Sequence, residues 1–83
     1  MKMRTKEKII RYLGFIGRAD RNQIANYILA KQTVVTTRLQ ELKHSGIVQY
    51  MKWSDGHKVW VLTQEGYRRC DYYEQRDKRT RAD

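Results

Sequence analysis

Apolar residues at helical spacing open the chain. Ile9, Leu13 and Ile16 lie four and three residues apart, and basic side chains occupy the opposite face. This pattern predicts a helix that begins at Thr5, a residue type that caps helices well, and ends before Gly17.

A second, shorter helix is predicted to follow. Asp20 and Gln23 have the spacing of a capping box, in which each side chain accepts a hydrogen bond from the backbone amide of the other residue. Ile24 and Ile28 then share one face, and the pattern ends near Ala30.

A third helix is predicted over residues 32–45, with Gly46 as the residue that terminates it. Val35, Leu39 and Leu42 cluster within a narrow arc of the helical wheel and would face the core. The opposite side carries Thr33, Thr36, Thr37, Gln40 and His44. Threonine is a mediocre helix former, so this side is either ordinary exposed surface or a surface that another molecule reads.

The segment "IVQYMKWSDGHKVWVLT" has the pattern of a β-hairpin. Two runs rich in β-branched and aromatic residues flank an Asp-Gly pair, a strong hairpin signal. Alternation predicts that Val48, Tyr50, Trp60 and Leu62 face inward. The residues expected to face outward are Gln49, Met51, Val59 and Val61. That outer face is apolar, which suggests that a partner covers it.

A fourth helix is predicted after Thr63, its cap, with Glu65 in the first turn. Tyr67, Cys70 and Tyr73 follow helical spacing and form an apolar stripe. We interpret this stripe as a homodimer interface, in which Cys70 would approach its symmetry mate. The alternative is that the stripe packs on the chain's own first helix.

Size and charge narrow the classes of function. The 83 residues are expected to form one small domain over residues 1–75, followed by a basic, frayed tail over residues 76–83. A net charge of +9 and a pI of about 10.0 point to a polyanionic partner, most often nucleic acid. A protein that is merely basic is the plain alternative.

The single cysteine excludes an intrachain disulfide and any metal site built on paired cysteines. It is typical of a reducing compartment. The N-terminus lacks the pattern of a signal peptide, and no apolar run approaches the length of a membrane span. We therefore expect a cytoplasmic location and no membrane partner.

No catalytic set is apparent. His44 and His57 fall in the last turn of a helix and in a hairpin turn, while Asp20, Asp55 and Glu65 are explained as cap, turn and first-turn residues. No glycine-rich phosphate loop and no pair of carboxylates at catalytic spacing is present. We expect no enzymatic activity, no metal, no cofactor and no small-molecule effector.

The order helix, helix, helix, hairpin, helix carries a resemblance to a known family. The segments "DRNQIANYI" and "TVVTTRLQELKHSGIV" are similar to the two helices of a helix-turn-helix, "YMKWSDGHKVW" to a wing, and "VLTQEGY" to the segment after it. The chain resembles the winged helix-turn-helix family of small bacterial, archaeal and viral regulators. The resemblance implies an α+β winged helix: a three-helix bundle with a helix-turn-helix, a two-stranded β-hairpin wing and a C-terminal helix.

The resemblance also implies that the third helix enters the major groove of double-stranded DNA. The expected base-reading residues are Gln32, Thr33, Thr36, Thr37, Arg38 and Gln40. A glutamine can bond adenine through two hydrogen bonds, and threonine methyls can contact thymine. Residues 21–40 contain no acidic side chain, which suits a surface that approaches phosphates.

Contacts to the DNA backbone are expected mostly from side chains outside that helix. They are Lys8, Arg21, Lys31, Lys52, Trp53, His57 and Lys58. Residues 47–66 carry two acidic and two basic side chains and sum to zero charge, so less of the attraction to DNA is expected from the wing.

Two other functions fit the same sequence. The wing and the aromatic ring of Trp53 suit a module that binds single-stranded nucleic acid or RNA by stacking. A winged helix can also recruit a polymerase or replication factor through protein contacts. The leading hypothesis is a dimeric, sequence-specific regulator that binds double-stranded DNA.

Overall fold

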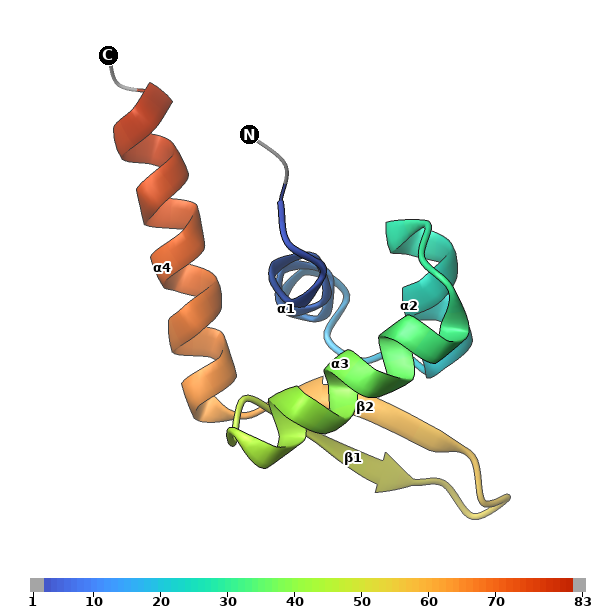
Figure 1. Cartoon of the computed structure of the whole chain (residues 1–83). Helices are drawn as coiled ribbons and strands as arrows, with labels where there is room; N and C mark the ends of the chain where they lie inside the picture. The colour runs from blue at the N-terminus through green and yellow to red at the C-terminus, as the bar shows by residue number, and fades with distance from the viewer. Residues whose placement is uncertain (1–2, 82–83) are drawn as a thin grey trace.

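The computed structural model describes residues 3–81. The elements in chain order are α1 (Thr5–Ile16), α2 (Arg21–Ile28), α3 (Gln32–His44), β1 (Val48–Lys52), β2 (Lys58–Leu62) and α4 (Gln64–Arg81). Figure 1 shows α1 in the centre, between α2 and α4, with α3 and the antiparallel hairpin below them. The predicted α+β order is confirmed.

The ends of the first two helices partly match their sequence signals. The capping box of α2 is confirmed, because the amide of Gln23 donates to Asp20 Oδ1 over 2.8 Å and the amide of Asp20 donates to Gln23 Oε1 over 2.9 Å. The prediction that Thr5 caps α1 is wrong: Thr5 is the first helical residue, and Arg4 precedes it without a side-chain bond. Helix α2 ends at Ile28, earlier than predicted, because Leu29 adopts a left-handed conformation with φ of 58°.

The core lies between the three N-terminal helices and the inner face of the hairpin. The largest fully buried side chains are Ile9, Leu13, Ile24, Leu39, Val35 and Val48. The predicted inward face of the hairpin is confirmed, since Val48 pairs with Leu62 and Tyr50 pairs with Trp60. The backbone of Ala19 adds two hydrogen bonds to Trp60, of 3.1 and 2.8 Å, and so holds the hairpin against the loop between α1 and α2.

The outer face of the hairpin differs from the expectation at one position. Val59 was expected to face solvent, but only 6% of it is exposed. The register places Met51 directly opposite Val59, and the bridge between Ala19 and Trp60 brings the loop before α2 to the other edge of β2. Strand β2 therefore has neighbours at both edges, which a period-two pattern does not reveal.

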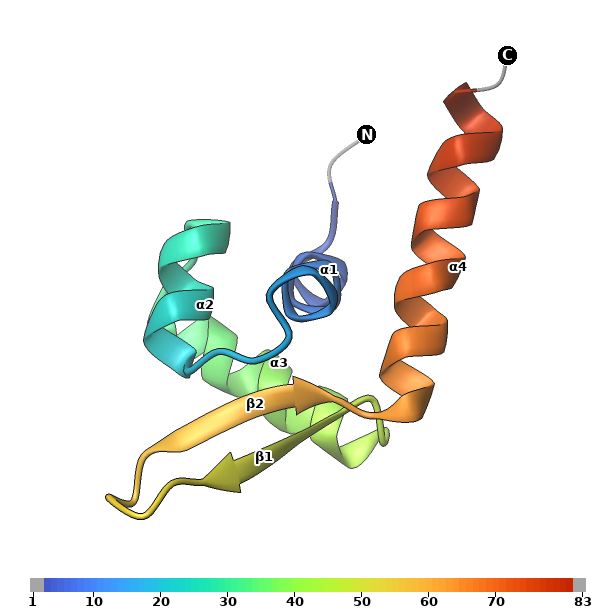
Figure 2. The same cartoon turned by 180° about the vertical axis from the view of Figure 1, so that it is seen from behind.

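Helix α4 begins as predicted. The hydroxyl of Thr63 accepts a hydrogen bond from the amide of Gly66 over 3.1 Å and donates to the carbonyl of Gly46 over 2.6 Å. One threonine therefore caps α4 and ties its start to the end of α3. Figure 2, from behind, shows α4 rising from the hairpin on the far side of α1 from α2.

The predicted apolar stripe on α4 does not form one exposed surface. Cys70 is buried in the chain's own core, against α1, where a Cβ built on Gly14 would lie 2.6 Å from its sulfur. Burial raises the pKa of the Cys70 thiol, which disfavours the thiolate needed for disulfide formation. Tyr73 is partly buried on the same core, and only Tyr67 stays exposed. The alternative, packing on the first helix, thus holds for Cys70 and Tyr73, while the homodimer stays a prediction.

The predicted frayed tail is helical as far as Arg81, so the predicted domain boundary at residue 75 falls inside α4. The reason is an ion-pair cluster that joins α4 to α1: Glu7 binds Arg76 over 2.8 Å, and Arg11 binds Asp77 over 2.8 Å. Residues 82 and 83 lie outside the described residues. None of the helices within residues 3–81 combines the length and the apolar character required to cross a membrane.

Candidate nucleic-acid interface

Helix α3 has one buried side and one exposed side. Val35 and Leu39 are fully buried, and Leu42 is nearly so, which fixes the helix on the core. Gln40 and Thr37 point away from these residues and are exposed. Within residues 3–81, the side-chain amide of Gln40 has no hydrogen-bond partner. The predicted separation of a packing face from a polar face is therefore present.

The threonines of α3 bond back to their own helix. Thr36 Oγ1 donates to the carbonyl of Gln32 over 2.9 Å, and Thr37 Oγ1 donates to the carbonyl of Thr33 over 3.0 Å. Each hydroxyl proton is thereby satisfied inside the helix. What remains for a ligand is the methyl group and the acceptor lone pairs, which suit thymine methyls and the amino groups of adenine or cytosine.

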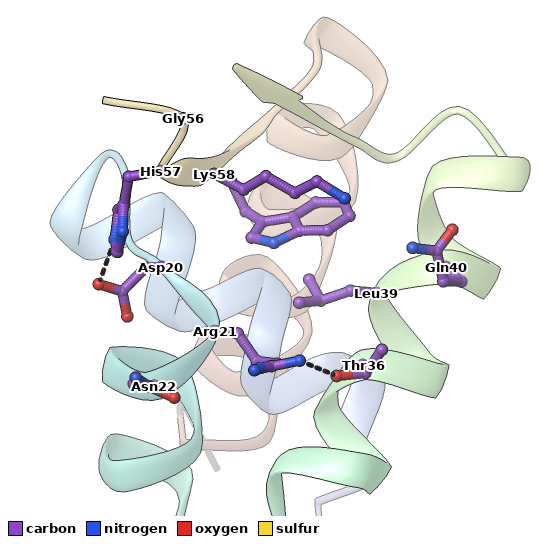
Figure 3. A pocket seen from close by; sticks show the side chains of 10 residues that line it. Asp20, Arg21, Asn22, Thr36, Leu39, Gln40, Gly56, His57 and Lys58 are labelled. Carbon is purple, nitrogen blue, oxygen red and sulfur yellow. Dashed lines mark hydrogen bonds and ion pairs between the residues drawn. The ribbon is translucent and has the colours of Figure 1, made fainter. Parts of the chain in front are cut away.

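A hollow of about 300 Å³ separates α3 from the hairpin and the start of α2. Its lining consists of Asp20, Arg21, Asn22, Thr36, Leu39, Gln40, Gly56, His57, Lys58 and Trp60. Figure 3 shows that these side chains come from three separate elements, with Gln40 on one wall and His57 on the other. Five of the predicted DNA contacts therefore meet in one groove.

Two polar contacts hold the walls of this groove together. Arg21 of α2 donates to Thr36 Oγ1 of α3 over 3.3 Å. His57 Nε2, at the base of the hairpin turn, lies 3.0 Å from Asp20 Oδ2, at the start of α2. The hairpin tip is thus fixed to the helix-turn-helix through a side chain that also caps α2.

The environment of Asp20 favours its ionised form. The hydrogen bond from the backbone of Gln23 lowers the pKa of Asp20 below its ordinary 3.8, and the His57 contact lowers it further. Because the folded-state pKa is depressed, the stabilisation is complete above the pKa of the unfolded chain and is lost as the pH falls through the folded value.

Acid should therefore destabilise the domain partly through Asp20. Between about pH 6 and pH 2, the melting temperature of Asp20→Asn should fall less than that of the unaltered chain, since asparagine still caps a helix but carries no charge. Circular dichroism melts at a series of pH values measure this. The matched control is Glu74→Gln, an exposed neutralisation on α4, which should leave the pH profile unchanged. Parallel profiles for all three proteins would contradict the assignment.

Other predicted contacts do not meet in the groove. Arg38 is half-buried and pairs with Glu41 over 2.9 Å, and Glu41 also pairs with Lys6 of α1 over 3.4 Å. Arg38 is thus turned towards α1, and its place among the base readers stays a prediction. The short i,i+3 ion pair holds the guanidinium on that flank.

The remaining predicted residues lie around or away from the groove. Lys31 and Gln32 are exposed at the start of α3, and Lys52 is exposed on the hairpin. Trp53 is 47% exposed, with the guanidinium of Arg18 at 5.1 Å from its ring centroid. Lys8 instead borders a different hollow, of about 360 Å³, between α1 and α2.

Sequence reasoning missed two residues near the groove. Asn22 lines the groove from the first turn of α2. Its place two residues after the predicted cap Asp20 indicated that it would lie at this end of the helix. Lys43 is not among the predicted DNA contacts, but its ammonium lies 4.6 Å from the centroid of the Tyr50 ring on the hairpin. Among the described residues, no group of three or more His, Cys, Asp or Glu side chains is arranged to hold a metal ion.

Solved structures share this whole arrangement. MepR, a transcription regulator of the Staphylococcus aureus multidrug efflux pump MepA, superposes with a TM-score of 0.91 at 15% identity over 96% of this chain. The chain is a winged helix-turn-helix domain. NadR, solved with 4-hydroxyphenylacetate, matches this domain with a TM-score of 0.85 at 28% identity over 96% of the chain. A MarR family transcriptional regulator from Silicibacter pomeroyi gives 0.83 at 18% identity over 93%.

The winged-helix domain spans only part of these proteins. It covers 61% of the MepR chain, 59% of the NadR chain and 53% of the Silicibacter pomeroyi chain. No protein-family model matches the sequence, and no curated protein is significantly similar to it.

Proposed function

We propose that this domain binds double-stranded DNA in a sequence-specific manner, as a non-enzymatic transcription regulator whose α3 reads the major groove. The observation that carries the proposal is the exposed side of α3 formed by Thr33, Thr37 and Gln40. Short methyl and acceptor groups and one free amide lie there on a helix that is fixed by a buried face. An α-helix of this kind fits the major groove, where the base edges are distinguishable.

Charge placement supports a nucleic-acid partner. Glu41, the acidic residue next to Gln40 on α3, is turned towards α1 and paired with Arg38 and Lys6. The Arg38 hydrogen bond and the Lys6 contact hold the pKa of Glu41 below its ordinary value. The reading side thus carries no unpaired carboxylate within residues 3–81, while Arg21 and Lys58 border the adjoining groove. Asp20, the carboxylate that lines this groove, accepts a hydrogen bond from the amide of Gln23 and lies 3.0 Å from His57 Nε2, which reduces its repulsion of a phosphate backbone.

The fold supports the same proposal. The solved proteins that share it at high TM-score are transcription regulators by description. We extend the base-reading role of that fold to this chain because its third helix has the side chains that base contacts require.

Truncating the proposed reader should cost affinity at one base position. Gln40→Ala should weaken binding to the preferred duplex by about 1–3 kcal/mol and relax the preference at that position. The fold should survive, because the side chain is exposed and makes no packing contact with the core. A selection from random duplexes supplies the preferred site, and fluorescence anisotropy titrations on that site and on a scrambled duplex give the two affinities.

The control variant is Lys8→Ala. Lys8→Ala shortens a long exposed side chain and also removes one positive charge, and Lys8 lies between α1 and α2, away from the groove. It should leave the ratio of the two affinities unchanged. Equal weakening of both duplexes by Gln40→Ala would show that α3 does not read the bases.

The exposure of Trp53 supports a second candidate, binding of unpaired nucleic acid by stacking. One residue, Arg18, already lies over this ring, so a base would have to stack on the free face or displace the guanidinium. Tight binding of an unpaired oligonucleotide with strong tryptophan quenching, together with weaker binding of every duplex, would favour this candidate over the first.

A further inference from the structure

Two lysines share one aromatic ring beside the reading groove. The ammonium of Lys43, in the last turn of α3, lies 4.6 Å from the centroid of the Tyr50 ring. The ammonium of Lys58, the first residue of β2, lies 4.8 Å from the same centroid. Each contact has the geometry of a cation–π interaction. Lys43 and Lys58, which are 15 positions apart in the sequence, thus place two positive charges around one ring between α3 and the hairpin.

This pair of charges is electrostatically unfavourable when the protein is alone. Because the ammoniums lie 4.6 and 4.8 Å from one ring centroid, their separation is less than one Debye length at moderate salt. Neither forms a salt bridge with a carboxylate in the described part of the chain. A cation–π contact at an exposed site contributes only about 0.5–1 kcal/mol, and it does not neutralise charge. An anion placed between the two lysines would relieve the repulsion.

The ring that holds the lysines is itself held firmly. Tyr50 is half-buried and packs on the indole of Trp60, with the ring centroids 5.3 Å apart. Trp60 is buried and bonded through its backbone to Ala19. Figure 3 shows Lys58 extending across the top of the groove towards α3. The core therefore fixes the position of the Tyr50 ring, and the two exposed lysine side chains extend to it.

We propose that Lys43, Tyr50 and Lys58 form a clamp for one backbone phosphate of the DNA strand that borders the groove read by α3. Lys43 and Lys58 bind the phosphodiester oxygens, and Tyr50 is a positioning residue that holds both ammoniums. The inference rests on the proposed function and deepens it. A strand seated here would fix the depth and register of α3 in the groove, as phosphate contacts do in general.

The test uses the salt dependence of binding to the selected duplex and to the scrambled duplex. Lys43→Ala and Lys58→Ala should each weaken both duplexes alike and lower the slope of log affinity against log salt, and the two together should lower it by about one unit, because one phosphate contact is lost. Tyr50→Phe, which keeps the ring, should leave affinity and slope unchanged. Tyr50→Leu should weaken binding, and adding Lys43→Ala to it should cost clearly less than Lys43→Ala costs in the unaltered chain.

The matched control is Lys78→Ala. Lys78 is exposed on the last part of α4, which points away from the hairpin, and should leave the slope unchanged. Thermal melts verify that each variant is folded at the temperature of the titrations. An unchanged slope in both lysine variants, or full additivity of Tyr50→Leu with Lys43→Ala, overturns the clamp. If Gln40→Ala still relaxes the preference in that case, only the clamp fails; if the unaltered chain prefers no duplex, the proposed function fails.

Discussion

Gly66→Ala should lower the free energy of unfolding by about 3 kcal/mol or more. Gly66 is buried in the first turn of α4, and a Cβ at this position would collide with the carbonyl oxygen of Ile47. Two carbons of Leu62 would also lie 3.0 Å from it. The backbone cannot easily move away, because the Ile47 carbonyl accepts hydrogen bonds from the amide and the hydroxyl of Thr63, each of 3.0 Å.

Urea denaturation followed by circular dichroism measures this loss. Glu65→Ala is the neighbouring control, since Glu65 is exposed and its replacement should change stability by no more than about 0.5 kcal/mol. A Gly66→Ala protein within that margin would show that α4 can shift relative to the hairpin. The close approach of α4 would then not be a fixed feature of the domain.

The elements of the fold follow from local sequence signals. The capping box at Asp20 and Gln23 and the apolar spacing of Val35, Leu39 and Leu42 specify their helices through neighbours in the chain. The inward face of the hairpin follows from alternation, and the structure pairs Tyr50 with Trp60 on that face. These signals act over a few residues, so a single sequence is enough to interpret them.

The differences arise where distant residues meet. Helix α4 continues to Arg81 because Arg76 and Asp77 bind side chains of α1, almost 70 positions earlier in the chain. Cys70 looked like part of an exposed stripe, but Gly14 of α1 leaves room for it to enter the core. Local periodicity shows that a side is apolar and does not show which surface covers it.

In the candidate site too, local spacing predicted some side chains and contacts between distant residues determined others. The helical wheel was sufficient to predict that Thr37 and Gln40 face away from the core. It was not sufficient for Arg38, whose direction depends on Glu41 and on α1. The contact of Lys43 with Tyr50 depends on the angle between α3 and the hairpin, which only the packed core determines.

Leu39→Ala should destabilise the domain by about 2–5 kcal/mol. Leu39 is fully buried, and it lies between the core and the floor of the groove. Alanine would leave a cavity under the middle of α3, and a domain of this size has a total stability on the order of 5–10 kcal/mol. At physiological temperature, a measurable fraction of the molecules should therefore be unfolded.

Variants of the neighbouring residues Leu39 and Gln40 should then show that stability and base recognition depend on different sides of α3. Because DNA binds only the folded chain, saturating DNA should restore the melting temperature of Leu39→Ala, and its ratio of affinities for the selected and scrambled duplexes should stay unchanged. Gln40→Ala should do the opposite, with an unchanged melting temperature and a reduced ratio. Thermal melts with and without duplex, combined with the titrations, measure both quantities. If Leu39→Ala altered the sequence preference while remaining fully folded, the buried side of α3 would also shape the reading surface, and packing and reading would not be separate roles of this helix.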